Sequence, residues 1–356
     1  MHYTVRTHLH EEFKEAVMKK YDVLALGEVM LRLSPPNNER LMRSQVLENK
    51  VGGAELNVAG GLSLMHMKTG MITKLPDNDL GKFAVHTMGF SGVDAEYVAK
   101  DKSDDARIGI YYFEYGANPR KPGVVYDRKY SSVNHIDIND FPEEMYESTR
   151  CFMTTGITLA LGGKVRETAI EMIRRFKEKG ALIAFDVNFR GNLWNGPEAK
   201  ECIEKILPYV DIFFCSEDTA RLTFLKTGDV REIMQSFAEE YPLSVIASTQ
   251  RVVHSPKLHS FGSIAYNVKK KEFYQEAPYE AIDVVDRVGS GDAYIAGFLY
   301  GYLSSDGDCN KAVQYGNAAA AVKHSIPGDM AASDLEEIEK IIKDHKNTGY
   351  KSEMDR

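Results

Sequence analysis

The sequence predicts an α/β fold with a central, mainly parallel sheet, flanking helices and a small β-sheet lid. Short β-branched runs alternate with helical segments along most of the chain, which is the pattern of a parallel sheet covered by helices on both faces. Aromatic, β-rich sequence at residues 107–132 interrupts this alternation and predicts a hairpin outside the main sheet. Two glycine turns, at residues 52–62 and 286–297, each open a helix.

The first elements set up the parallel sheet. Residues 21–28 are a short apolar run ended by Gly27, which predicts a buried strand. Residues 30–33 alternate and predict a second strand, which Pro35 and Pro36 stop. The next elements expected are a helix of small residues after the first glycine turn, a strand at 69–73 and a helix at 80–91.

The predicted lid combines two separate stretches. Residues 108–114 and 123–128 are the two arms of the hairpin, and residues 31–50 are a polar surface excursion that could complete a small sheet with it. The expected organisation is therefore an N-terminal extension, residues 1–20, followed by one domain, residues 21–350, with the lid formed by about 31–50 and 107–132.

After the hairpin the alternation resumes to the end of the domain. The expected elements are strand 151–155, helix 164–179, strand 181–186, helix 197–207, strand 212–215, helices 219–227 and 229–240, strands 244–248 and 263–268, a buried strand 281–285, and helices 293–303, 310–324 and 333–345.

Composition excludes several classes of function. A formal net charge of -8, with basic and acidic residues interleaved, argues against nucleic-acid binding, which needs a concentrated basic face. The chain has neither an apolar run long enough for a membrane helix nor the apolar centre of a signal peptide near its start, so we expect a cytoplasmic protein. Scattered positions without metal-like spacing predict reduced core thiols for Cys151, Cys202, Cys215 and Cys309.

The second glycine turn carries the chemistry. Gly289 and Gly291 let the backbone approach a ligand closely, and the first free N–H groups of the following helix favour an anion there. Asp292 stands where a phosphate ought to be repelled, so it needs a role. In a phosphoryl-transfer site the turn, with Ser290, is the anion hole and Asp292 is the general base for an attacking hydroxyl.

Other interpretations of the glycine motifs are weaker. A dinucleotide-binding turn needs a third glycine and a position after an early strand, and neither is present. A merely structural turn, with Ser290 or Asp292 capping the helix, remains open at this point. Gly162-Gly163-Lys164 fails as a phosphate loop, because Val165 replaces the Ser or Thr that would hold the metal and residue 158 is not glycine.

The two turns together carry a family resemblance. Residues 52–59 (GGAELNVA) and 286–292 (DRVGSGD) resemble the two signatures of the ribokinase-like (PfkB) carbohydrate kinases, the second being the more specific. The resemblance runs from about residue 21 to residue 343 in matching order. It implies a ribokinase-like fold with a β lid that often serves as a dimer interface, and hence a homodimer formed through the lid.

Within that family the chain is most similar to the 2-keto-3-deoxygluconate kinases, which act on a small acidic sugar. Arginine suits such a substrate because a guanidinium can hold a carboxylate bidentately. The positions that the resemblance assigns to substrate binding are Gly52, Gly53, Asn57, Tyr111, Tyr126, Arg128 and Arg190.

For the nucleotide, the resemblance implies ATP with Mg²⁺. The residues that it assigns to nucleotide binding are Asn188, Ser216, Thr249, Arg251, Gly291 and Asn317. The family usually has an Asn and a Glu where this chain has Ser216 and Thr219, so Glu217 or Asp218 is the expected substitute near Mg²⁺. Asp286 matches a position that helps to bind a monovalent cation, K⁺, in some members.

The expected function is an ATP-dependent kinase that phosphorylates the terminal hydroxyl of 2-keto-3-deoxygluconate, giving the 6-phospho product. A fructokinase or a 5-dehydro-2-deoxygluconate kinase would keep the same catalytic residues and differ in the lid and arginine contacts. A catalytically silent binding protein is favoured by the departures at Ser216 and Thr219 and opposed by the intact Gly289, Gly291 and Asp292.

Overall fold

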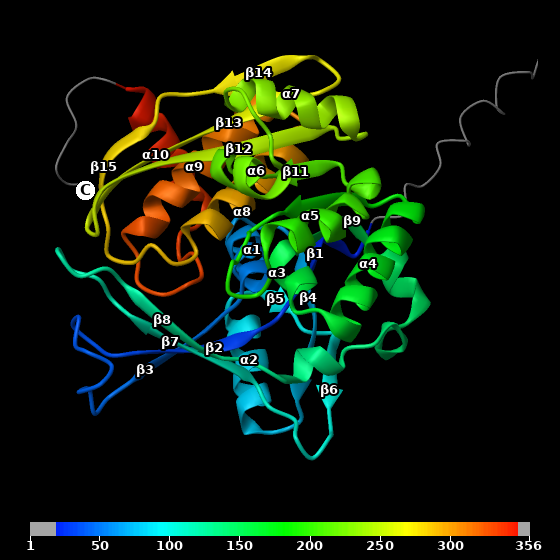
Figure 1. Ribbon diagram of the computed structural model, residues 1–356, viewed down its shortest axis with the longest axis vertical. Helices are drawn as coiled ribbons and strands as arrows, with labels where there is room; N and C mark the ends of the chain where they lie inside the picture. Colours follow the sequence, from blue (N-terminus) through cyan, green and yellow to red (C-terminus); the bar gives the residue numbers. More distant parts are fainter. Residues whose placement is uncertain (1–18, 348–356) are drawn as a thin grey trace, which may run out of the picture.

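The computed structural model describes residues 19–347, and a large mixed sheet crosses its centre (Figure 1). The predicted extension, residues 1–20, lies almost wholly outside the described residues. The strands of the large sheet run in the order β14 (Glu272–Gln275), β13 (Leu258–Asn267), β12 (Val245–Ser255), β11 (Ile212–Phe214), β10 (Leu182–Asp186), β9 (Thr149–Thr155), β1 (Tyr21–Leu26), β4 (Thr69–Pro76) and β5 (Val93–Asp94), with β15 (Tyr279–Asp283) beside β13 and β6 (Val98–Asp101) beside β4.

The strands from β12 to β5 pair in parallel, whereas β13 is antiparallel to each of its partners. The mainly parallel sheet predicted from the sequence is therefore confirmed. Because the carboxyl ends of parallel strands meet at one edge of a sheet, this arrangement favours a ligand site beyond the ends of β1, β10 and β11.

Helices cover both faces of the large sheet, as successive residues of one strand show: Phe152 packs into one core, and Cys151 and Met153 into the other. The first core takes its helices from α3 (Gly156–Ala160), α4 (Gly163–Glu178), α5 (Gly196–Glu204), α6 (Glu217–Phe224) and α7 (Val230–Glu240). The opposite face is covered by α1 (Ala54–Leu64), α8 (Ser290–Leu303) and α9 (Cys309–His324), with α2 (Asp79–Phe90) beside α1 and α10 (Leu335–Lys346) on α9.

The local sequences explain this packing. Helix α4 buries Val165, Ala169 and Phe176 along one stripe, at the spacing of an amphipathic helix. Helices α8 and α9 instead approach each other closely, since a Cβ at Gly297 would lie 2.3 Å from the carbonyl oxygen of Tyr315. The apolar run of α8 is thus a core helix, as predicted.

A second, smaller sheet lies outside the main fold, below and to the left of it in Figure 1. Its order is β3 (Glu48–Gly52), β2 (Met30–Ser34), β7 (Gly109–Glu114) and β8 (Gly123–Asp127), in which β2 and β7 are parallel and the outer pairs antiparallel. This confirms the predicted hairpin and its pairing with the segment near residues 31–50.

The prediction of a buried strand just before the second glycine turn is wrong. Residues 281–285 are not a buried strand: β15 ends at Asp283, pairs only with β13 and is mostly exposed. A β-branched composition suits an edge strand as well as a buried one, so composition alone did not separate the two. Strand β12 also continues past the predicted end at residue 248, forming a long hairpin with β13.

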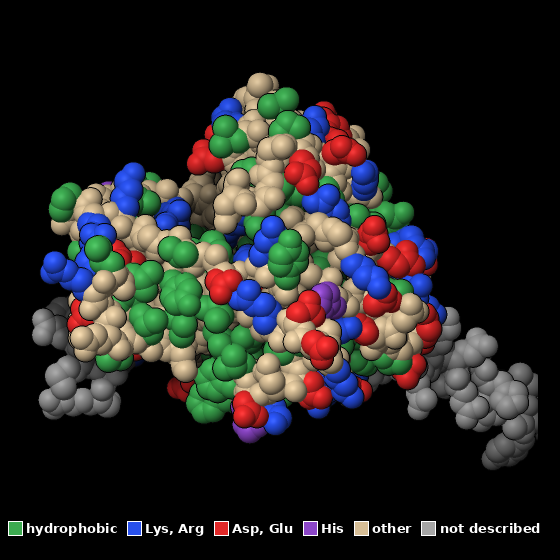
Figure 2. Space-filling model, turned by 60° about the horizontal axis from the view of Figure 1, so that its bottom comes forward, with side chains coloured by type: hydrophobic (Ala, Val, Ile, Leu, Met, Phe, Trp, Pro, Cys, Tyr) green, Lys and Arg blue, Asp and Glu red, His purple; other side chains and the backbone are tan. Residues whose placement is uncertain are grey.

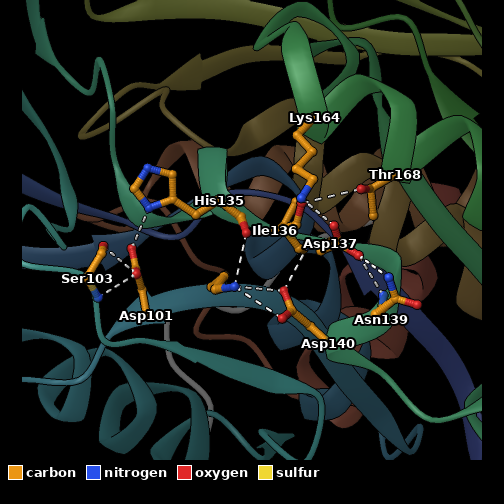
Figure 3. Close-up of polar contacts among 10 residues, drawn as sticks. Asp101, Ser103, His135, Ile136, Asp137, Asn139, Asp140, Lys164 and Thr168 are labelled. Atoms are coloured by element: carbon orange, nitrogen blue, oxygen red, sulfur yellow. Dashed lines mark hydrogen bonds and ion pairs between the residues drawn. The ribbon is translucent and has the colours of Figure 1, made fainter.

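Polar contacts fasten α4 and the turns before it to the β4 and β6 edge of the large sheet (Figure 3). Asp101, at the end of β6, accepts a hydrogen bond from the hydroxyl of Ser103 (2.6 Å) and lies 2.9 Å from Nδ1 of His135. Lys74, on β4, donates to the backbone carbonyl of His135 (3.0 Å) and to the carboxylate of Asp140 (2.9 Å). The network joins β4, β6 and the 3₁₀ turns at Ser132–His135 and Ile138–Asp140.

Two further expectations concern the described chain as a whole. The cysteines Cys151, Cys202, Cys215 and Cys309 are all buried and free, as predicted. Among residues 19–347, none of the helices has the length and apolar character needed to cross a bilayer.

Candidate active site

The second glycine turn begins helix α8 at the edge of the large sheet. Gly289 is the N-cap residue and has φ 80°, a left-handed conformation that favours glycine. A Cβ at this position would lie 1.8 Å from the carbonyl oxygen of Asp329, so no side chain fits there. The N–H of Ser290 donates to the backbone carbonyl of Arg287 at 3.2 Å, and the next N–H groups of the first helical turn are open to a ligand beside exposed Gly291.

Two cavities meet at this turn. The inner cavity, of about 430 Å³, lies between the small sheet, the start of α1 and the turn. The outer cavity, of about 350 Å³, lies beyond the carboxyl ends of β10 and β11 and beside the middle of β12. Both are lined by Asp186, Asn188, Arg190, Arg251, Ser290 and Gly291. A group bound in one cavity is therefore next to a group bound in the other.

Asp292 lies on the inner side of this junction. The Nδ2 of Asn57, from α1, donates to Oδ2 of Asp292 at 2.7 Å. Burial raises the pKa of Asp292 to about 6, and the charge of Asp329 acts in the same direction, whereas Asn57 and Arg190 oppose the rise. A carboxylate with this pKa is ionised at neutral pH and accepts a proton more readily than an ordinary one, as a general base should.

Asn57 offers a second contact to a ligand. Its amide nitrogen is used by Asp292, but the buried Oδ1 has no hydrogen-bond partner in the described part of the chain. Buried amide oxygens are normally paired, so this atom is suited to accept a hydrogen bond from a hydroxyl group. The first glycine turn thus holds the base and faces the same cavity, which Gly53 also lines.

Asp186 was not singled out in the sequence, yet it borders both cavities. It is the last residue of β10, the position at which parallel strands commonly present ligand-binding residues, so a signal was available. Burial raises the pKa of Asp186 to about 7, and the nearby charge of Asp292 raises it too. A cation placed at the junction would relieve this unfavourable environment.

The predicted substrate arginines have different surroundings. Arg128 lines the inner cavity, but its Nε donates to Oε2 of Glu28 at 2.8 Å and its Nη2 also contacts that carboxylate. One edge of the guanidinium is therefore taken, and a bidentate grip on a substrate carboxylate through that edge is excluded. Arg190 is exposed and lines both cavities, at the junction with Asp186 and Asp292.

Two further arginines make the junction an anion-binding environment. Arg251 lines both cavities and Arg287 lines the inner one. Burial lowers the pKa of Arg251, and the nearby charge of Arg287 lowers it further. An anion bound between these side chains would raise the pKa of Arg251 again, because its negative charge would offset both the burial and the repulsion from Arg287. Arg251 was expected near the phosphates from the sequence, whereas Arg287 was not assigned a role.

The outer cavity contains most of the predicted nucleotide residues, namely Asn188, Ser216, Thr249, Arg251 and Gly291. Asn317 does not line either cavity; it is buried in α9 and donates to Oε1 of Glu276 at 3.1 Å. Asn317 therefore lies away from the surface of these cavities, and its predicted role in nucleotide binding stays a prediction.

Only some of the candidate metal ligands line the outer cavity. Glu217 pairs with Arg221 at 2.6 Å and does not line the outer cavity, whereas Asp218 does. Ser216 donates to the hydroxyl of Thr219 at 2.9 Å and caps α6. Mg²⁺ bound to nucleotide phosphates needs only one or two carboxylates besides water, and Asp186 and Asp218 are the carboxylates that line the outer cavity.

A buried ionic cluster supports the inner cavity from behind. Tyr111 donates to the carboxylate of Asp329, and Nη1 of Arg32 donates to the same carboxylate at 2.6 Å. Nη2 of Arg32 lies 2.8 Å from Oδ2 of Asp286. Burial opposes the charge of Arg32, but the carboxylates of Asp329 and Asp286 outweigh it and raise its pKa. The sequence analysis missed Arg32 and Asp329, because the alternating pattern of β2 hides a buried charge.

Gly52 belongs to this cluster and not to the cavity lining. It ends β3, and a Cβ there would lie 2.3 Å from Oδ2 of Asp329. Lys164 of the rejected phosphate loop lines neither cavity; it pairs with Asp137 at the edge of the network in Figure 3.

A helix start with open N–H groups, a carboxylate of raised pKa beside it and two adjoining cavities are the features that a phosphotransferase needs to bring two substrates together. A family model described as pfkB family carbohydrate kinase matches residues 20–335. The chain belongs to this family of carbohydrate kinases, which use ATP with Mg²⁺.

Relatives give a consistent result over nearly the whole chain. The chain is 32% identical to a 2-dehydro-3-deoxygalactonokinase of Haloferax volcanii, covering 90% of this chain and 96% of that protein. It is 27% identical to a 5-dehydro-2-deoxygluconokinase of Geobacillus kaustophilus, over 92% and 96%. The crystal structure of a 2-dehydro-3-deoxygluconokinase from Thermotoga maritima is 32% identical, with a TM-score of 0.86 over 91% and 98% of the two chains.

Proposed function

We propose that this carbohydrate kinase transfers the γ-phosphoryl group of ATP to the terminal hydroxyl of 2-keto-3-deoxygluconate, giving the 6-phosphate. The observation that carries the proposal is the position of Asp292, held by Asn57 at the junction of the two cavities. An acceptor hydroxyl in the inner cavity meets the base there. The names of the relatives from Haloferax volcanii and Thermotoga maritima support an acid sugar of this class.

In the proposed reaction Asp292 accepts the proton of the acceptor hydroxyl while that oxygen bonds to the γ-phosphorus and the bond to ADP breaks. The N–H groups of Gly289, Gly291 and Asp292 stabilise the charge on the transferring group, whereas that of Ser290 donates to the backbone carbonyl of Arg287 at 3.2 Å. Arg190 and Arg251, at the junction, bind the phosphate oxygens. Asp186 and Asp218 would hold Mg²⁺, which when bound neutralises phosphate charge.

The carboxylate of the sugar would lie at the other end of the inner cavity, against the small sheet. Arg128 presents there the part of its guanidinium that Glu28 does not use, and Tyr126 lines the same wall. Asn57 Oδ1 accepts a hydrogen bond from a sugar hydroxyl. Arg128 therefore distinguishes an acid sugar from a neutral one, whereas Arg190 serves the reacting end.

A second candidate acceptor is 5-dehydro-2-deoxygluconate, after which the relative from Geobacillus kaustophilus is named. It also carries a carboxylate and would use the same wall. A fructokinase, with a neutral acceptor, fits less well because Arg128 would then have no anion to bind. A silent binding protein is disfavoured by the intact Asn57–Asp292 pair.

An ADP-release assay with a panel of sugars tests the proposal. The panel contains 2-keto-3-deoxygluconate, its galactonate epimer, 5-dehydro-2-deoxygluconate, fructose and ribose. We expect the highest kcat/KM with a 2-keto-3-deoxy acid and at least about tenfold less with the neutral sugars, since one charged contact is worth at least that factor. Preference for fructose or ribose would contradict the proposal, and absence of ADP release with every sugar of the panel, despite ATP binding, would favour the silent protein.

We also propose that the small sheet is both the lid of the inner cavity and a dimer interface. Strand β8 is exposed along its whole length, with Val124 43% and Val125 56% exposed, and the nearby loop residue Met42 is 81% exposed. Hydrophobic side chains also gather in patches on the face turned forward in Figure 2. Sedimentation of the protein and of Val125→Glu tests the interface: we expect a dimer that the substitution dissociates.

A further inference from the structure

A buried lysine lies directly behind the glycine turn. Lys323, in the last turn of α9, is 1% exposed. Its Nζ donates to the backbone carbonyl of Asp286 at 3.3 Å and to that of Ile326 at 3.0 Å. A buried ammonium that is not in contact with substrate needs a structural or electrostatic reason, because removing a charge from water is costly.

These two carbonyls belong to the two segments that shape the anion hole. Asp286 begins the turn that leads to Gly289. Ile326 begins the loop that ends at Asp329, whose carbonyl oxygen abuts Gly289 so closely that no Cβ fits. The ammonium of Lys323 therefore joins the turn to the loop against which it packs, and it fixes where the N–H groups of the turn point.

The position next to Asp286 is the one at which the family resemblance implies K⁺. The residues here do not fit that ion. The carboxylate of Asp286 is engaged by Arg32 (2.8 Å), by the hydroxyl of Tyr115 (3.2 Å) and by the N–H groups of Val288 and Gly328 (3.0 Å each). Its carbonyl oxygen faces Lys323. K⁺ sites in proteins are built from such oxygens, and here two side-chain cations already occupy them.

We propose that the ammonium of Lys323 is a built-in substitute for a monovalent cation, so that this kinase positions its anion hole without K⁺. Lys323 is in this sense a positioning residue and touches neither substrate. The inference rests on sugar kinase activity alone and holds whichever acid sugar is the acceptor. Failure of the substrate proposal and failure of this one are thus separate results.

The first test is the cation dependence of the wild-type enzyme, assayed by ADP release with the best acceptor of the panel. Potassium, sodium and tetramethylammonium chloride are compared at equal ionic strength, so that the screening of exposed charges is the same in each. The kcat values should lie within about twofold of one another, because the enzyme needs none of these cations. Stimulation by K⁺ of about tenfold or more over tetramethylammonium would overturn the proposal.

The second test removes the ammonium. In tetramethylammonium chloride we expect Lys323→Ala to lose about 10²-fold in kcat, the size of one preorganised electrostatic contact, with KM for the sugar changed much less. Ammonium or potassium chloride should restore most of the loss, because the space vacated by the side chain admits a small cation. Lys323→Met, which fills that space, should stay impaired in every salt. Lys311→Ala, on the exposed side of the same helix, is the matched control.

Thermal unfolding supplies a readout that does not depend on activity. Potassium or ammonium chloride should raise the Tm of Lys323→Ala above its value in tetramethylammonium chloride, since a ligand of the native state stabilises it. The Tm of the wild type and of Lys323→Met should not depend on the cation. A folded Lys323→Ala without rescue by either ion, or full activity of Lys323→Met, would refute the proposal. If Lys323→Ala fails to fold, Lys323→Met and the wild-type series decide.

Discussion

At the scale of single residues, the site depends on carboxylates kept in surroundings that disfavour their charge. Burial raises the pKa of Asp292 to about 6 and that of Asp186 to about 7. The negative charge of Asp329 raises the pKa of Asp292 further, and that of Asp292 raises the pKa of Asp186 further. Perturbed pairs of this kind are typical of catalytic sites. The same property that makes Asp292 a better base makes the fold less stable while Asp292 is ionised.

The pH dependence of catalysis follows from the pKa of Asp292. Only the ionised carboxylate accepts the proton of the acceptor hydroxyl, so kcat/KM should rise with pH through about 6 and level off above it. Measuring kcat/KM from pH 5 to pH 8 at constant ionic strength shows the position of this limb. An acid limb near the ordinary carboxyl pKa of about 4 would contradict the assignment.

Replacing Asp292 with Asn should separate activity from stability. The loss of the base should lower kcat by about 10²- to 10⁴-fold. The native protein should at the same time become more stable at pH 7 by about 1–3 kcal/mol, because a raised carboxyl pKa penalises the ionised form in the folded state.

The sign of this stability effect can be checked by varying pH. The penalty is fully present above about pH 6 and disappears below about pH 4, where Asp292 is protonated in both the folded and the unfolded state. Chemical denaturation of wild type and Asp292→Asn at pH 7 and pH 4 measures it. Near-normal kcat in the variant, or equal stability differences at the two pH values, would refute this account.

Testing the role of Arg128 in substrate binding requires a variant that leaves no unpaired charge. Arg128→Met alone would strand the buried carboxylate of Glu28, a loss of about 3–5 kcal/mol in stability. Arg128→Met combined with Glu28→Gln removes both charges. We expect this double variant to raise KM for the acid sugar by at least about tenfold and to leave KM for fructose nearly unchanged. Equal changes for both sugars in the ADP-release assay would show that Arg128 does not bind the carboxylate.

At the scale of elements, the catalytic geometry comes from junctions between segments far apart in the sequence. The start of α8 lies against the loop at Asp329, and the start of α1 lies against Asp292. Contacts between distant segments cannot be predicted from a local sequence pattern, whereas other features of the molecule can. The glycine turns, the order of strands and helices, and the position of Asp292 at the start of a helix all leave local patterns of residue type and spacing.

Other parts of the site left no local pattern. Arg32 lies in an ordinary alternating strand, and only the fold shows that it pairs with Asp286 and Asp329. The pairing of Arg128 with Glu28 joins residues 100 positions apart. The exposed character of β15 depends on its place at the edge of the sheet, which composition does not encode. Tertiary contacts, and not residue types, decided these features.

The network of Figure 3 provides an element-scale test away from the site. Burial alone would raise the pKa of Asp101, but the hydroxyl and N–H of Ser103, together with His135, hold it at about 2. Asp101→Asn should therefore cost about 1–3 kcal/mol in the free energy of unfolding at pH 7, while kcat stays near that of the wild type.

The stabilisation by Asp101 should be present above about pH 4 and be lost as pH falls toward 2, because its folded-state pKa is depressed. Urea denaturation at several pH values compares Asp101→Asn with the wild type, and exposed Asp104→Asn serves as the matched control. A cost for Asp104→Asn as large as that for Asp101→Asn would contradict a special role for this network.

At the scale of the whole molecule, the proposed function assigns the reaction to the large sheet and its helices, and the choice of acceptor to the small sheet. The glycine turn, Asp186 and Asp292 belong to the main fold, whereas Tyr111, Tyr126 and Arg128 come from β7, β8 and the residue after β8. Sugar kinases with different acceptors can share the first part and differ in the second. The relatives from Haloferax volcanii and Geobacillus kaustophilus, which are named as kinases of two different keto acids, agree with this division.

The central claim is that phosphate is transferred to the terminal hydroxyl of the acid sugar, and identification of the product tests it most directly. Purified enzyme, ATP, Mg²⁺ and 2-keto-3-deoxygluconate are incubated, and the product is analysed by phosphorus NMR with coupling to protons. We expect one new phosphomonoester, formed in equal amount to ADP, whose phosphorus couples to the two protons of the terminal CH₂ group. A phosphorus coupled to a CH proton, or ADP without any sugar phosphate, would contradict the account.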